Sequence, residues 1–63
     1  MANFTLTFAT DNAAFDEGNL HVEIARILRD VADTADSGIN LTGRIMIRDI
    51  NGNRVGSFGV QED

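Results

Sequence analysis

Near its beginning the chain alternates apolar and polar side chains, a pattern that predicts a half-buried β-strand. Phe4, Leu6 and Phe8 are separated by threonines at positions 5 and 7. Successive side chains of a strand point to opposite faces, so a period of two places the three apolar residues on one face of a sheet. Aromatic and β-branched residues also favour strands. We therefore expect a first strand over residues 4–9.

From residue 20 the period of the apolar positions lengthens to about 3.6, which predicts an amphipathic helix. The apolar stripe consists of Leu20, Ile24, Ile27, Leu28, Val31 and Ala35. Asn19 is a suitable N-cap residue, and Ser37-Gly38 is a suitable end, with Gly38 just beyond the C-cap. Before the helix, residues 12–15 are expected to form one short helical turn.

Two further alternating segments flank Asn51-Gly52, a dipeptide that strongly indicates a β-hairpin. Two registers compete. With a two-residue loop at Asn51-Gly52, Ile45 lies opposite Phe58 and Asp49 opposite Arg54. The apolar residues that then share one face are Leu41, Ile45, Ile47, Phe58 and Val60. A buried sheet face selects this register, and it is the one we expect.

The alternative is a three-residue loop over residues 50–52, with Gly52 in the left-handed conformation. Ile45 would then lie opposite Ser57, and Phe58 would turn to the other face, because a slip of one residue exchanges the faces. The segment from Asp49 also suits a type I turn with a bulge, so this alternative stays open.

The order of the predicted elements is β-α-β-β. We expect one small α+β domain over residues 1–63, with a three-stranded sheet and one amphipathic helix on one face. A chain of 63 residues buries only about 60% of its unfolded surface, so its stability is marginal. It has no Cys for a disulfide, and its single His cannot build a structural zinc site. Self-association is therefore favoured, and we expect a homodimer.

One helix covers only one face of a three-stranded sheet, so the other face has no cover from within the domain. In the expected register this second face presents Arg44, Met46, Arg48 and Val55. Met and Arg are enriched at protein interfaces. We therefore expect these four residues to form the dimer interface.

Charge is distributed unevenly along the chain, which has ten acids, five arginines and a net charge of −5. Such a field repels phosphate, so we expect no direct binding of nucleic acid. No segment is long and apolar enough to predict a membrane span. Surface acids often serve only solubility. The sharper interpretation is that Glu23, Asp30 and Asp33 on the helix bind a protein partner.

The sequence contains no arrangement of residues typical of catalysis. His21 has neither a Cys nor a Ser motif to activate as a nucleophile. The glycines form no phosphate-binding loop between a strand and a helix. We therefore expect a protein that is not an enzyme and that uses no cofactor or metal.

Three segments together resemble small uncharacterised proteins encoded by bacteriophages and prophages. They are residues 10–15 (TDNAAF), 25–29 (ARILR) and 49–56 (DINGNRVG). The resemblance implies a phage accessory protein in the cytoplasm of a bacterial host, which binds a host protein, for example to inhibit a defence system. The alternative is a protein that sequesters a small ligand or nucleotide, with a site at a dimer interface built from Arg44, Arg48 and Arg54.

Overall fold

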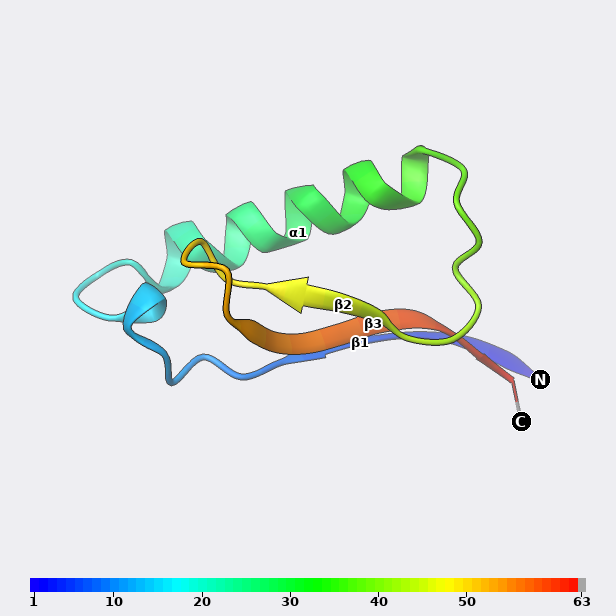
Figure 1. Ribbon diagram of the computed structural model, residues 1–63, viewed down its shortest axis with the longest axis horizontal. Helices are drawn as coiled ribbons and strands as arrows, with labels where there is room; N and C mark the ends of the chain where they lie inside the picture. Colours follow the sequence, from blue (N-terminus) through cyan, green and yellow to red (C-terminus); the bar gives the residue numbers. More distant parts are fainter. Residues whose placement is uncertain (63) are drawn as a thin grey trace.

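The computed structural model describes residues 1–62, and within them it contains a three-stranded antiparallel sheet and a single α-helix (Figure 1). Strand β1 spans Ala2–Phe8, β2 spans Ile45–Arg48 and β3 spans Arg54–Glu62. Helix α1 spans Leu20–Asp36, and a 3-10 turn, η1, spans Ala13–Phe15. The predicted α+β fold of order β-α-β-β is thus confirmed, and Asp63 of the predicted domain lies outside the described residues.

The last strand of the chain lies in the middle of the sheet, whose order is β1-β3-β2. Strand β3 pairs antiparallel with both neighbours, so β1 and β2 run parallel to each other on its two sides. The chain crosses from one edge to the other through α1 and then returns between them, as in a split β-α-β unit. This topology makes β1 and β2 the edge strands of the described sheet.

The hairpin between β2 and β3 closes through a three-residue loop, Ile50-Asn51-Gly52. The N–H of Asp49 donates to the carbonyl of Asn53 at 2.8 Å, and the N–H of Gly52 donates to the carbonyl of Asp49 at 3.0 Å. Gly52 has a φ of 86°, a left-handed conformation that glycine adopts without strain. The prediction of a two-residue loop is therefore wrong, and the loop belongs to the alternative register.

A β-bulge at Val55 nevertheless restores the expected pairing of the strands. Arg48 lies opposite Arg54, and the next pair is Ile47 with Gly56, so Val55 has no opposite residue in β2. Beyond the bulge Ile45 lies opposite Phe58, as predicted. The extra residue in β3 compensates the extra residue in the loop. The apolar side chains of both strands therefore stay on one face.

The core lies between this face of the sheet and α1. Its buried residues are Ala14 and Phe15 from η1, Ile27 and Val31 from α1, and Ile47 and Phe58 from the sheet. Phe8 stacks on Phe15 with ring centroids 6.1 Å apart. The helix buries a narrower stripe than the sequence predicts, since Leu20 and Leu28 remain 38% and 47% exposed.

Ile47 and Ile50 provide a matched test of this packing, because both lie in the hairpin and are 4% and 68% exposed. Ile47→Ala should lower the free energy of unfolding by about 2–5 kcal/mol, since it removes buried methyl groups and leaves a cavity. Ile50→Ala should change it by less than about 0.5 kcal/mol. Urea denaturation measures both values, and equal losses would contradict the observed packing.

Candidate functional site

Glu23 lies inside the protein and not on the exposed helix side where we expected a partner to bind. The residue is only 3% exposed. Its carboxylate accepts hydrogen bonds from Nε and Nη2 of Arg26 at 2.7 and 3.0 Å. The backbone N–H of Ile50 donates to the same carboxylate at 2.8 Å. Glu23 therefore ties α1 to the hairpin loop, and the prediction that it binds a partner protein is inconsistent with its burial.

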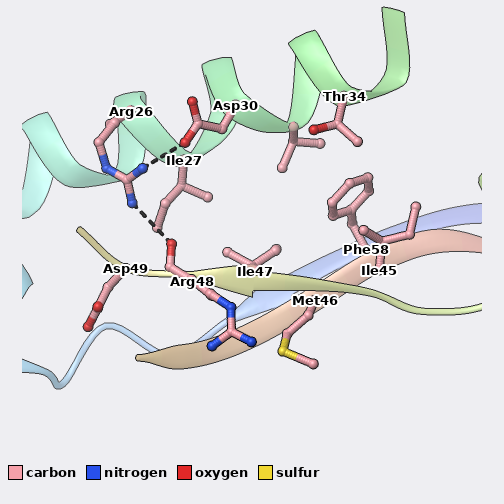
Figure 2. Close-up of a pocket in the computed structure, with 11 residues that line it drawn as sticks. Arg26, Ile27, Asp30, Thr34, Ile45, Met46, Ile47, Arg48, Asp49 and Phe58 are labelled. Carbon is pink, nitrogen blue, oxygen red and sulfur yellow. Dashed lines mark hydrogen bonds and ion pairs between the residues drawn. The ribbon is translucent and has the colours of Figure 1, made fainter. Parts of the chain in front are cut away.

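Arg26 extends this connection from the helix to the edge strand β2 (Figure 2). Its Nη1 donates to Asp30 Oδ2 at 2.7 Å, and its Nη2 donates to the carbonyl oxygen of Arg48 at 3.1 Å. Beside it, a groove of about 260 Å³ runs between α1 and β2, and core residues such as Ile27 and Ile47 line its inner wall. Arg26 thus binds the backbone carbonyl of the last residue of β2, directly before the hairpin loop begins.

Asp49 organises the hairpin loop and is 4% exposed. Its carboxylate accepts hydrogen bonds from the backbone N–H groups of Asn51 and Asn53 at 2.9 and 2.8 Å. The side-chain amides of Asn12 and Asn53 donate to it at 2.7 and 3.2 Å. Since Asn12 directly precedes η1, one carboxylate holds both the loop and the segment that leads to the helix.

The burial of Glu23 and Asp49 was not predicted from the sequence, although the position of each residue indicates it. Glu23 stands four residues before Ile27 and eight before Val31, so it lies on the buried stripe of α1. Asp49 occupies the first position of a turn that ends in Gly52, where Asp commonly accepts hydrogen bonds from the backbone two residues on. Both acids support the structure of the hairpin and leave its outer surface to other residues.

The pKa values of both acids are lowered. For Glu23 the hydrogen bonds from Arg26 are the main cause, and they outweigh burial, which raises the pKa. For Asp49 burial is the largest single effect and raises the pKa, but the combined hydrogen bonds from Asn53, Asn12 and Asn51 lower it below its usual value. The pKa of Arg26 is raised, chiefly by its bond to Glu23. The network is therefore held in its charged form.

The sheet face opposite α1 gathers three other arginines around a methionine, and we call Arg44, Met46, Arg48 and Arg54 the arginine face. Figure 2 shows the side chains of Met46 and Arg48 pointing away from the helix. Arg48 lies directly opposite Arg54 in the sheet. A shallow hollow of about 460 Å³ lies on this face, lined by Arg44, Met46, Arg54, Val55, Gly56 and Ser57.

The positive charges of the arginine face are not neutralised within the part of the chain that the structure describes. There the salt bridges are those of Arg26 with Glu23 and Asp30. Arg48 instead donates to the carbonyl of Gly52 at 3.1 Å. Like charges placed directly opposite each other in a sheet are destabilising. The two guanidinium groups turn apart, that of Arg48 to Gly52 and that of Arg54 to Met46, and both remain open to anionic groups from outside.

The other residues predicted to contact partners lie in two different places. Val55 is half-buried at the bulge, where it packs against the core and also lines the hollow. Asp30 and Asp33 are exposed on α1, on the layer opposite the arginine face. Of the acidic side predicted from the sequence, these two residues remain available to a partner.

Among residues 1–62 no group of His, Cys, Asp and Glu side chains is placed to hold a metal ion. No described helix is long and apolar enough to cross a membrane. Comparison of the chain with known protein families, with curated proteins and with solved structures found no match. The relation to phage proteins therefore stays a prediction from the sequence.

The two buried acids predict loss of stability in acid. Because folding lowers both pKa values, the folded state binds fewer protons than the unfolded state. The stabilisation is complete above the ordinary values of 4.5 and 3.8 and is lost as the pH falls through the lower folded values. The urea midpoint should therefore be constant from neutral pH to about pH 5 and should fall below about pH 4.

Asp33→Asn is the matched control, because Asp33 is exposed on the same helix and forms no salt bridge with any described residue. Glu23→Gln and Asp49→Asn should each flatten the acid limb of the curve, and Asp33→Asn should leave it unchanged. An identical pH response in all three variants would show that the buried network is not its source.

Proposed function

We propose that this chain acts by binding another protein, and that the arginine face binds an acidic surface of that partner. The observation that carries this proposal is the cross-strand pair of Arg48 and Arg54, which has no compensating acid among the described residues. Carboxylates from a partner would accept charge-assisted hydrogen bonds from these unpaired guanidinium groups, and such bonds are about twice as strong as neutral ones.

The composition of the arginine face supports a protein partner. Met46 is 40% exposed and gives the face an apolar centre, with Arg54 Nε 2.9 Å from its Sδ atom. Met and Arg are the residues that protein interfaces enrich, and guanidinium groups pair with carboxylates through two parallel bonds. A sheet face with this composition suits the surface of a folded protein.

The charge of this face opposes its use as the dimer interface that the sequence predicted. In a two-fold interface the same patch contacts itself, so the three arginines of one copy would be brought against the three arginines of the other. Burying like charges against one another is unfavourable unless acids compensate them. An acidic partner meets this requirement, and a second copy of the same face does not.

In the setting that the sequence resemblance implies, the partner is a protein of a bacterial host, and binding serves to inhibit it. Electrostatic complementarity speeds the encounter of such proteins and selects the correct partner. The exposed acids Asp30 and Asp33 lie on the other layer and remain a predicted second surface, for a basic partner. The arginine face is the better defined of the two surfaces.

A small anionic ligand such as a nucleotide is a second candidate, which the hollow on the arginine face favours. Its volume of about 460 Å³ lies within the range of small-molecule sites. Arg44, Arg54 and Ser57 line it within one copy of the chain. Nucleoside triphosphate would then raise the melting temperature of the unmodified protein and not of Arg54→Glu. The absence of a shift at millimolar nucleotide would exclude this candidate.

Arg54→Glu separates binding from stability. The substitution places opposite charges across the strands beside Arg48, so it should raise the free energy of unfolding by about 0.2–1 kcal/mol. It also removes positive charge from the arginine face, so the affinity for the partner should fall by about tenfold or more. Urea denaturation measures the first effect. Capture from a bacterial host lysate, followed by affinity measurement with the isolated partner, measures the second.

Arg29→Glu is the matched control, because it makes the same change in net charge at an exposed position of α1. Proteins that bind through the arginine face should be retained by the unmodified chain and by Arg29→Glu, and lost from Arg54→Glu. If both variants lost the same proteins, the loss of binding would be explained by the change in net charge alone. Full retention by Arg54→Glu would rule out the arginine face.

A further inference from the structure

Strand β1 is an edge strand without the features that usually protect such an edge. Its seven residues, ANFTLTF, include no charged residue and no proline. Its pairing with β3 continues without a bulge from Ala2 to Phe8. Natural proteins protect exposed edges with charges, prolines, bulges or very short strands, because an open edge can pair with another chain. Strand β1 is long, regular and uncharged.

The opposite edge, β2, is protected. It has four residues and includes Arg48. The Nη2 group of Arg26 donates to the carbonyl oxygen of Arg48 at 3.1 Å and so occupies a backbone group that faces the free side of β2. The two edges of this sheet therefore differ. The contrast indicates that the backbone groups along the free side of β1 are available to pair with another strand.

The hydrogen bonds of the sheet show which backbone groups of β1 are open. The N–H of Ala9 donates to the carbonyl of Val55 at 2.9 Å. In an antiparallel ladder every second residue points its N–H and C=O to the same neighbour. Thr5 and Thr7 therefore bond to β3, whereas Phe4 and Leu6 direct their backbone groups to the free edge. Among the described residues, no backbone group of a loop or turn bonds to these groups.

We propose that two copies of this chain pair through β1, antiparallel about a two-fold axis at Thr5. Thr5 is the middle residue of the strand, so this register pairs all of β1 with its copy. It sets Phe4 opposite Leu6 of the second copy and Ala2 opposite Phe8. These are the residues whose N–H and C=O groups are open, so each such pair can exchange hydrogen bonds in both directions. The two sheets then form one continuous sheet.

The side chains of β1 fit this register as well as its backbone does. Phe4 is 53% exposed although its ring lies 6.2 Å from that of Phe58 on the helix side of the sheet. Pairing would bring it beside Leu6 of the second copy, and neighbouring apolar side chains across strands are stabilising. No charge is buried or opposed at this edge, in contrast to the arginine face. Self-pairing through β1 also leaves the arginine face free for a partner.

Disulfide trapping tests the register directly, because the chain contains no Cys of its own. In Thr5→Cys the two thiols meet at the axis, in a pair whose Cα atoms are about 4.5 Å apart, which is within disulfide range. In Thr7→Cys, on the same face of the same strand, the register separates the two Cα atoms by about 14 Å. Mild oxidation should cross-link Thr5→Cys and leave Thr7→Cys monomeric on a non-reducing gel.

Met46→Cys completes the set by reporting a dimer through the arginine face. Rapid cross-linking of Met46→Cys in place of Thr5→Cys would overturn the proposal, and so would equally slow cross-linking of all three variants. Hydrogen exchange in the unmodified protein gives an independent readout. The amides of Phe4 and Leu6 should become more protected as protein concentration rises, since assembly follows mass action. Fast exchange of these two amides at every concentration would refute self-pairing. The edge would then be available only to a strand of another protein.

Discussion

Two buried carboxylates hold the hairpin loop: Asp49 accepts hydrogen bonds from the N–H groups of Asn51 and Asn53, and Glu23 accepts one from the N–H of Ile50 at 2.8 Å. A charged acceptor makes this bond stronger than an ordinary backbone contact, and Arg26 keeps the acceptor charged. These bonds hold a three-residue loop, and the bulge at Val55 compensates its extra residue. The strands beyond the bulge then bury Phe58, while the loop sets Arg54 opposite Arg48 on the outer face. Core and surface therefore depend on the same contact between helix and loop.

The sequence predicts the elements of this fold because periodicity reflects local burial. The alternation of Phe4, Leu6 and Phe8 and the apolar stripe of the helix suffice for one strand and one helix. The loop length could not be predicted, because Asn51-Gly52 suits both loops and part of what holds the loop is Glu23, far away along the chain. The strand order could not be predicted either, since β1 shows the same alternation whichever strand it pairs with. The predicted register placed Arg44 and Arg48 on the outer face but set Arg54 opposite Asp49. The three-residue loop sets Arg54 opposite Arg48 and so adds it to that face.

The two surfaces available to partners differ in kind. The chain carries a net charge of −5, yet the charged residues that define the arginine face are all cations. Recognition depends on the local field of a surface more than on net charge, so an acidic protein can still bind an acidic partner. The open edge of β1 is uncharged and offers backbone groups instead. One small sheet can thus present a face for a charged partner and an edge for a second copy, without competition between them.

The central claim is that the loop and the bulge together set the pairing that turns the arginines outward. The most direct measurement is the nuclear Overhauser effect between Hα protons across β2 and β3. In a pair that exchanges no hydrogen bonds the Cα atoms are only about 4.5 Å apart, so its Hα protons give a strong signal. Met46 lies opposite Ser57 in the observed register, and the account predicts the strong Hα contact between these two residues. A strong contact of Met46 with Gly56 in its place would mean that the strands are slipped by one residue, and it would contradict the account.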